Sequence, residues 1–187
     1  MQITSLAIAD VKLIQPRKFG DERGFFSEVY KQAALREAGV DMTFVQDNHS
    51  MSAATATVRG LHFQLPPHAQ AKLVRVTRGR ILDVAVDIRK GSPTYGKHVT
   101  AEISAENWTQ ILIPVGFAHG LMTLEPNTEV LYKVSSAYAA SHDAGLLWND
   151  QDLGISWPDV GIPPLLSDKD CKLPRLKDFN SPFEYPS

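Results

Sequence analysis

The sequence predicts an all-β fold of the barrel or sandwich type. Its 187 residues include 12 Gly and 12 Pro, which recur at short intervals and leave little room for long helices. The runs between them are rich in Val, Ile, Leu, Thr and aromatic residues, as strands are. In residues 83–88 (DVAVDI) the valines and the isoleucine share one face and the two aspartates share the other. This period of two is typical of a strand in a packed sheet.

Ten segments are expected to be strands on these criteria. Each is a short β-branched, aromatic or alternating run, bounded by residues that favour turns. In chain order they span residues 11–14, 24–30, 43–48, 58–64, 72–77, 80–88, 98–103, 109–113, 120–124 and 128–135.

Helices are expected at two places. Residues 31–38 carry a modest apolar stripe of Ala and Leu, and Gly39 supplies a stop. A second, short helix is expected near Ser167, because the hydroxyl of this residue can cap the turn formed by residues 168–170.

One domain is expected for the whole chain. Its length is ordinary for a domain with a real core, and no internal repeat or linker divides it. The core is expected at about residues 1–157. Residues 158–187 are rich in proline and are expected to form a strap that lies over the barrel.

The composition excludes several classes of protein. Charged residues make up only 21% of the chain, and the lone Cys171 cannot form an intrachain disulfide, so neither a disordered nor a disulfide-stapled chain is expected. The formal net charge of −2 argues against sequence-independent nucleic-acid binding. No apolar run approaches the roughly 20 residues that span a bilayer, and the first residues lack a basic region, so a cytoplasmic protein with no membrane partner is expected.

Familiar motifs for nucleotide, hydrolase and zinc sites are absent from the sequence. There is no GxGxxG, Walker loop, GxSxG or CxxC. Six histidines on a β-barrel could form a metal site. However, such sites usually take two His from alternate positions of one strand, and Gln64 stands where the second His would follow His62. No metal is expected.

A few polar residues stand where a strand should be apolar or close to a turn. Lys72 and Tyr132 alternate with valines, which places both side chains on inward faces. His62 follows Gly60, and a glycine within a strand often marks a bulge or a close backbone approach. His119 lies between two glycines in a turn that enters a strand. His, Tyr and Lys together suit proton abstraction beside a carbonyl better than hydrolysis, phosphoryl transfer or redox chemistry.

Taken together, eight motifs closely resemble the dTDP-4-dehydrorhamnose 3,5-epimerase family. The match runs in order from about residue 19 to residue 174, and the ordered set is far more specific than any single motif. The motifs are residues 19–26 (FGDERGFF), 44–50 (FVQDNHS), 59–64 (RGLHFQ), 70–75 (QAKLVR), 83–89 (DVAVDIR), 113–120 (IPVGFAHG), 131–133 (LYK) and 148–150 (WND).

The resemblance implies a cupin-like jelly roll that forms a homodimer and uses neither metal nor cofactor. The implied reaction inverts C3 and C5 of dTDP-4-dehydro-6-deoxy-glucose, the carbons that flank the C4 ketone, to give dTDP-4-dehydro-rhamnose. By the resemblance, His62 is the base, Tyr132 the acid on the opposite face, and Lys72 the group that stabilises the enolate oxygen. Asp170 matches the carboxylate that orients the base, with Asp83 as a rival for that partnership.

The resemblance also implies a set of contacts to the substrate. The arginines suit the diphosphate, while the carboxylate and amide side chains can read the thymine and sugar edges. Asp143 stands where relatives often have Glu, which is a longer side chain. The implied contacts are Arg23, Glu28, Gln46, Asp47, Asn48, Arg59, Lys72, His119, Asp143 and Lys169.

Other functions remain open at this point. A 3- or 5-monoepimerase of a related deoxysugar pathway would carry nearly the same motifs. A metal-dependent cupin oxygenase or isomerase would lose its activity to a chelator, and a non-catalytic sugar-binding jelly roll would bind its ligand without proton exchange. Strand 24–30 is a candidate for exchange between protomers, because it supplies implied ligand contacts from a segment far from His62 in sequence.

Overall fold

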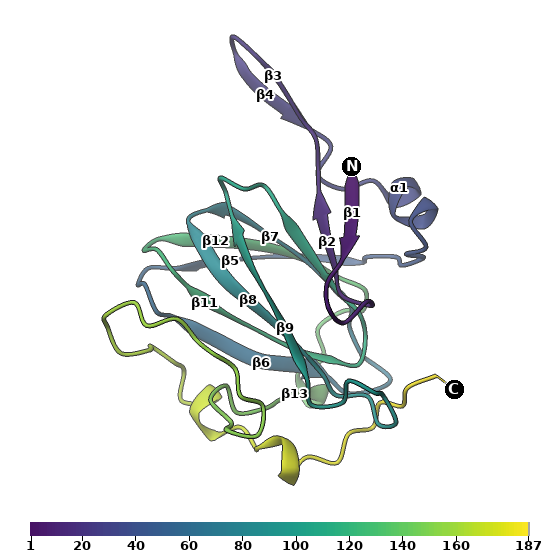
Figure 1. Ribbon diagram of the computed structural model, residues 1–187, viewed down its shortest axis with the longest axis vertical. Coiled ribbons are helices and arrows are strands. Elements are labelled where there is room, and N and C mark those ends of the chain that lie inside the picture. The colour runs from purple at the N-terminus through teal and green to yellow at the C-terminus, as the bar shows by residue number, and fades with distance from the viewer. Residues whose placement is uncertain (187) are drawn as a thin grey trace.

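Two antiparallel sheets face each other in a computed structural model that describes residues 1–186 (Figure 1). This arrangement confirms the predicted all-β fold and its cupin-like jelly-roll form. The larger sheet runs in the order β1 (Gln2–Ser5), β2 (Lys12–Gln15), β10 (Gln110–Ile113), β7 (Lys72–Arg78), β12 (Thr128–Val134) and β5 (Gln46–Ser52). The smaller runs in the order β13 (Asp143–Gly145), β6 (Val58–Gln64), β11 (Phe117–Thr123), β8 (Arg80–Asp87) and β9 (His98–Ser104).

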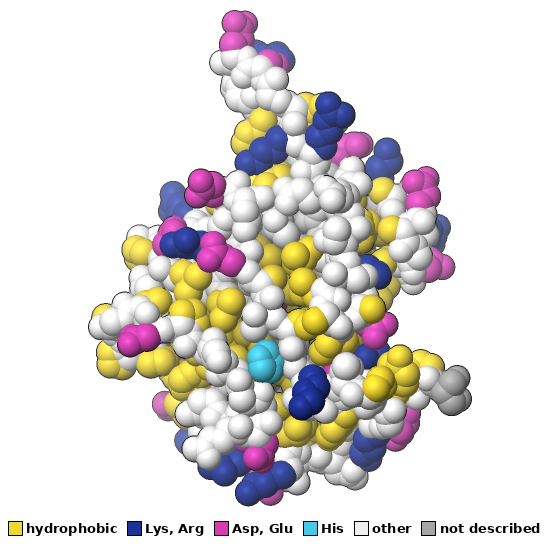
Figure 2. Space-filling model, viewed as in Figure 1, with side chains coloured by type: hydrophobic (Ala, Val, Ile, Leu, Met, Phe, Trp, Pro, Cys, Tyr) yellow, Lys and Arg dark blue, Asp and Glu magenta, His cyan; other side chains and the backbone are white. Residues whose placement is uncertain are grey.

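A separate hairpin stands away from this barrel. Strands β3 (Lys18–Asp21) and β4 (Gly24–Ser27) pair only with each other, and they project beyond the barrel at the top of Figure 1. Figure 2 shows charged side chains gathered at its tip. Helix α1 (Gln32–Glu37) follows, within the span that the sequence predicts.

Strand boundaries depart from the predictions at several places. Predicted strand 24–30 ends at Ser27, predicted strand 43–48 begins only at Gln46 and runs on to Ser52, and predicted strand 120–124 begins earlier, at Phe117. The sequence prediction missed β1, β3 and β13. These are strands of three or four residues that exist through pairing with β2, β4 and β6 respectively, which a local pattern does not reveal.

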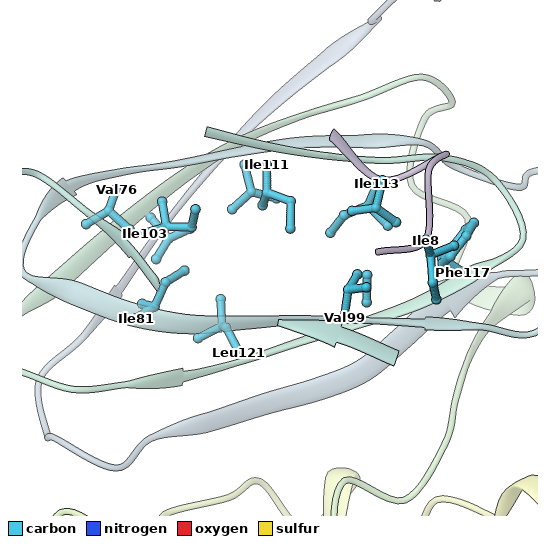
Figure 3. Close-up of a cluster of buried hydrophobic side chains, with 13 residues drawn as sticks. Ile8, Val76, Ile81, Val99, Ile103, Ile111, Ile113, Phe117 and Leu121 are labelled. Carbon is cyan, nitrogen blue, oxygen red and sulfur yellow. The ribbon is translucent and has the colours of Figure 1, made fainter. Parts of the chain in front are cut away.

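The main core fills the space between the two sheets. Ile111 and Ile113 of β10 point from one layer toward Leu121 and Val99 of the other (Figure 3). Every member of this cluster is almost fully withdrawn from solvent. Because this core is apolar, polar residues elsewhere in the interior are exceptions that need an explanation.

Strand β8 is buried on both faces. The predicted alternation is confirmed, because Val84 and Val86 lie on one face while Ile81 and Ala85 lie on the other. However, the valine face does not point into the barrel. It packs under the C-terminal segment, whose Phe183 belongs to the same cluster.

The C-terminal segment lies along the outside of the smaller sheet (Figure 1). It contains two short 3-10 turns, η2 (Asp170–Lys172) and η3 (Leu176–Asp178), and an earlier one, η1 (Ala140–His142), precedes β13. The Asp170 amide donates a 3.1 Å hydrogen bond to Ser167 Oγ, so the cap predicted at Ser167 is present. The last strap residue, Ser187, lies outside the described residues. None of the helices among residues 1–186 has the length and apolar character needed to cross a membrane.

Replacing Ile103 with alanine is expected to lower the free energy of unfolding by about 2–5 kcal/mol. Ile103 is fully buried in the main core, so the shorter side chain leaves a cavity there. Urea denaturation measures this loss. The control is Ile162→Ala: Ile162 is 49% exposed, and its loss should change stability by no more than about 0.5 kcal/mol. Equal losses in the two variants would contradict the assignment of the core.

Candidate active site

A cavity of about 520 Å³ opens into the barrel between the two sheets. Side chains from the smaller sheet, from the larger sheet and from the C-terminal segment all reach it. It therefore draws together residues that are more than one hundred positions apart in sequence. Of the predicted site residues, Arg59, His62, Lys72, His119, Tyr132, Lys169 and Asp170 line this cavity.

His62 of β6 forms a close pair with Asp170. Its Nε2 lies 2.6 Å from Asp170 Oδ1, while the Gly60 amide approaches the other carboxylate oxygen at 3.5 Å. Burial by itself would raise the pKa of Asp170, but the hydrogen bond and the charge of His62 outweigh it and hold that pKa below its usual value. Asp170 is therefore a carboxylate that accepts the Nε2 proton of His62, so that the lone pair lies on Nδ1 whenever the imidazole is in its neutral form.

Glycine at position 60 is required by the packing of β6 on β11. The backbone φ of Gly60 is +114°, and a Cβ there would lie 2.6 Å from the His119 carbonyl oxygen. The pairing of β6 with β11 shifts register between His119 and Leu121. The close backbone approach predicted from this glycine is thus present, and it sets His62 opposite His119.

Lys72 of β7 points into the same cavity from the larger sheet, as its alternation with Val74 and Val76 predicts. Its Nζ donates a 3.2 Å hydrogen bond to the His62 carbonyl oxygen. Burial lowers the pKa of Lys72 to about 8, against the opposing attraction of Asp83 and then of Asp143. At neutral pH the side chain is therefore still mostly an ammonium ion.

Tyr132 of β12 faces inward as predicted and packs against the main core. Burial raises the pKa of its phenol, Arg59 opposes this rise, and Asp143 adds to it. A phenol with a raised pKa keeps its proton at neutral pH. Tyr132 is thus available as a proton donor on the sheet opposite His62.

His119 of β11 forms a close pair with Asp83 of β8. Its Nε2 lies 2.9 Å from Asp83 Oδ2, and both residues are buried. The two candidates for the partner of His62 are thereby separated by geometry: Asp170 contacts His62, and Asp83 contacts His119.

Further predicted contacts lie at the rim of the cavity. A smaller hollow of about 170 Å³ adjoins it, and there Gln46 donates a 2.8 Å hydrogen bond to Asn48. Asp143 forms an ion pair with Lys169 and accepts a 3.2 Å hydrogen bond from the Tyr138 hydroxyl. The shorter Asp143 side chain therefore still reaches a lysine of the rim.

Three predicted contacts are not brought to this cavity within one chain. Arg23 lies on the projecting hairpin, its side chain 84% exposed and paired with Asp21 at 2.5 Å. Glu28 lies beside Lys31 near helix α1, where the two side chains form a 3.9 Å ion pair. The side chain of Asp47 is 70% exposed and pairs with Lys133, because Asp47 alternates with the half-buried Gln46 and Asn48 along β5.

Sequence reasoning missed several residues of the cavity wall. Ser50 follows Gln46 and Asn48 at the same period of two, so the pattern contained a signal for it. Three of the missed residues belong to the C-terminal segment, where no periodic pattern indicates which side chains turn inward; they are Leu165, Leu166 and Ser167. The others are Thr57, Val58, Leu121 and Val130.

Metal ligands do not cluster in the described part of the chain. Residues 1–186 contain no group of three His, Cys, Asp or Glu side chains arranged to hold an ion. His62 and His119 each direct Nε2 to a carboxylate instead. Cys171 is free and exposed.

Fold and cavity together define a class of protein. A jelly-roll barrel that holds a histidine–carboxylate pair, a tyrosine and a lysine in one interior cavity is suited to acid–base catalysis on a small bound molecule.

Comparison with known proteins identifies the family. The profile of the dTDP-4-dehydrorhamnose 3,5-epimerase family matches residues 5–178. A dTDP-4-dehydrorhamnose 3,5-epimerase of Sinorhizobium fredii is 55% identical over 185 residues, which cover 99% of this chain and 94% of that protein. The chain belongs to this family of isomerases that act on nucleotide sugars.

Solved structures agree with this assignment. A dTDP-4-dehydrorhamnose 3,5-epimerase from Bacillus anthracis with TDP and PPi bound superimposes with a TM-score of 0.89 at 51% identity, covering 93% of this chain and 98% of that one. A dTDP-6-deoxy-D-glucose-3,5-epimerase from Legionella pneumophila in complex with dTDP-4-keto-L-rhamnose gives a TM-score of 0.94 at 39% identity, covering 100% and 99%.

Proposed function

We propose that this protein inverts C3 and C5 of dTDP-4-dehydro-6-deoxy-glucose and so produces dTDP-4-dehydro-rhamnose for dTDP-L-rhamnose biosynthesis. The observation that carries the proposal is that His62 and Tyr132 face one cavity from opposed sheets. Inversion needs a base on one face of the carbon and an acid on the other, since a single group would mostly return its own proton. Family membership supplies the substrate class.

His62 begins each inversion. Nδ1 of the neutral imidazole takes the proton from C3 or C5, and the electrons of the broken C–H bond move into a C=C bond to C4, which leaves the negative charge on the C4 oxygen. Asp170 holds the ring through Nε2 and stabilises the imidazolium that forms. The proton that His62 gains passes to solvent before the second carbon is deprotonated, and again before the next cycle.

Lys72 and Tyr132 complete the step. The Lys72 ammonium stabilises the enolate oxygen inside the barrel, where the local dielectric is lower than in bulk water and an ionic contact is therefore stronger. Tyr132 then donates its phenolic proton to the opposite face of the carbon and recovers a proton from solvent. Positioned acid–base groups of this kind each contribute about 10²–10⁴-fold to the rate.

The rim is proposed to hold the nucleotide end of the substrate. Arg59 and Lys169 supply positive charge for the diphosphate, and the polar side chains of Gln46 and Asn48 share the smaller hollow with Lys169. Asp143 completes the rim, whereas His119 is proposed to contact the substrate inside the cavity. Arg23, Glu28 and Asp47 do not reach this cavity in the single chain.

We further propose a homodimer in which the β3–β4 hairpin crosses to the partner. The hairpin exposes Phe19, Phe25 and Phe26, the last at 66%, although large apolar side chains at a hairpin are usually covered. It also carries Arg23, which the family resemblance assigns to the substrate. Exchange would bury the aromatics and bring Arg23 to the partner's cavity.

A mixed dimer tests this exchange. One protomer carries His62→Ala and the other Arg23→Ala, each with its own purification tag, so that the heterodimer can be isolated. If the hairpins cross, one of its two sites is intact, and it should show about half the activity of the wild-type dimer. Both single-variant homodimers should be nearly inactive. A heterodimer as inactive as both homodimers would contradict the exchange.

The direct assay of the proposed function is conversion of dTDP-4-dehydro-6-deoxy-glucose, followed by NMR, with and without EDTA. Equal conversion in both samples supports acid–base epimerisation. Activity lost to EDTA would favour the metal-dependent cupin alternative, and binding without conversion would favour a sugar-binding module. Inversion at one carbon only would identify a monoepimerase.

We also propose that residues 1–187 work as one domain located in the cytoplasm. The C-terminal segment supplies Asp170 to the site and Phe183 to the packing of the smaller sheet, so it cannot be separated from the barrel without loss. An exposed free thiol at Cys171 suits a reducing compartment.

A further inference from the structure

One ionisable side chain of the barrel interior has no task in the mechanism above, namely the carboxylate of Asp83. The residue is 0% exposed. It projects from β8 on the same face as Ile81 and Ala85, which belong to the main core. A carboxylate in such a place is costly to the fold unless neighbouring groups compensate its charge.

Only one of the two carboxylate oxygens of Asp83 is hydrogen-bonded to the protein. Oδ2 lies 2.9 Å from His119 Nε2, whereas Oδ1 has no hydrogen-bond partner among the described residues. In the pairing of β8 with β11, Asp83 lies opposite Leu121 and His119 lies opposite Ala85. The Asp83 side chain therefore reaches diagonally across to His119. Strand β11, which carries His119, lies between β8 and β6, the strand of His62.

The charge of Asp83 also acts on Lys72, across the barrel. Burial drives the pKa of Lys72 down to about 8, and Asp83 is the strongest of the groups that oppose this fall. Asp143 comes second, but it already forms an ion pair with Lys169 at the rim. The charged and titratable groups that line the cavity and its rim around Lys72 are His62 and Arg59 of β6, His119 of β11, Tyr132 of β12, Asp143 of β13, and Lys169 and Asp170 of the C-terminal segment. Asp83 of β8 is not part of this lining and acts on Lys72 from its place beside His119.

His119 responds to the same carboxylate. Burial lowers the pKa of His119, Asp83 opposes this, and Lys72 and His62 lower it further. The ring is therefore neutral at neutral pH and donates its Nε2 proton to Asp83. Its Nδ1 is left as an acceptor, which suits a hydroxyl group of the sugar.

We propose that Asp83 is a positioning residue for the epimerisation: its buried charge keeps Lys72 in the ammonium form, and its hydrogen bond holds His119 as the Nε2–H tautomer. The inference rests on the proposed function, because the Lys72 ammonium matters through the enolate oxygen that it stabilises. It adds a second carboxylate–histidine pair to the site, distinct in task from that of His62 and Asp170.

The test is the pH dependence of turnover in Asp83→Asn. The variant keeps the shape and an oxygen acceptor for His119 but removes the charge, so Lys72 should lose its proton at lower pH. We expect the alkaline limb of kcat to move down by about one pH unit or more, which gives about a tenfold loss at pH 8.5 and little loss at pH 6.

Asp87→Asn is the matched control. Asp87 lies on the same strand and face as Asp83 and is equally buried. However, it pairs with Arg89, which is not a residue of the cavity, whereas Asp83 pairs with His119. Its alkaline limb should coincide with that of the wild type even if its stability falls. An unmoved limb in Asp83→Asn, or an equal shift in both variants, would overturn the proposal.

A measurement without substrate separates this proposal from the proposed function. The Nζ resonance of Lys72 in ¹⁵N-lysine-labelled protein, assigned with Lys72→Arg, should titrate at lower pH in Asp83→Asn than in the wild type. An unchanged midpoint would overturn the proposal whether or not the protein proves to be an epimerase. If Asp83→Asn does not fold, the ¹³C resonance of Asp83 in the wild type decides: an ionised carboxylate at pH 7 supports the proposal, and a neutral acid overturns it.

Discussion

His62→Ala is expected to abolish deuterium exchange at both C3 and C5 of the substrate. One base serves both carbons in the proposed mechanism, so neither proton can be abstracted without it. Turnover should fall by at least about 10²–10⁴-fold. The measurement is NMR of dTDP-4-dehydro-6-deoxy-glucose incubated with the variant in D₂O.

Binding of the nucleotide should survive this substitution. The Kd for dTDP, measured by calorimetry, should stay within about threefold of the wild-type value, because the base acts on the sugar. His98→Ala is the control, since His98 lies on β9 outside the cavity. Exchange that persists at either carbon in His62→Ala would show that a second base exists.

Tyr132→Phe is expected to uncouple exchange from inversion. His62 can still abstract a proton and return deuterium from solvent to the same face, whereas delivery to the opposite face has lost its donor. Product formation should fall by about 10²–10⁴-fold while some exchange into unconverted substrate remains. One NMR time course records both rates.

Tyr95→Phe serves as the control for removing a phenolic hydroxyl elsewhere in the chain. Its product formation should match that of the wild type, because Tyr95 lies outside the cavity. Unchanged product formation in Tyr132→Phe would remove Tyr132 from the role of acid. Complete loss of exchange would instead mean that Tyr132 takes part in abstraction.

Local patterns predicted the inward faces of the site well. Alternation with valine placed Lys72 and Tyr132 inside the barrel, and Gly60 indicated the close approach that sets His62 opposite His119. Each of these features depends on a period of two or on the lack of a Cβ, both of which are local properties of a strand.

Partnerships between distant segments could not be predicted in this way. Whether Asp83 or Asp170 contacts His62 depends on how the C-terminal segment folds back on β6, and that path has no periodic pattern. Asp47 shows the same limit. The family resemblance assigns it to the substrate, which stays a prediction, and nothing in the local pattern indicated that its side chain would lie on the outer face of β5 and pair with Lys133.

The hairpin shows a different limit. Residues 24–30 were expected to form one strand, but pairing ends at Ser27, and the hairpin pairs with no strand of either barrel sheet. Exposed aromatic side chains such as Phe26 indicate a surface that is covered by another molecule. A single-chain pattern contains no information about that surface.

Proton exchange in D₂O tests the central claim most directly. Wild-type protein is incubated with dTDP-4-dehydro-6-deoxy-glucose in D₂O, and the sugar is followed by NMR. The proposed function predicts deuterium at both C3 and C5 of an inverted product, with or without EDTA. Substrate that binds and yet gains no deuterium at either carbon would contradict it.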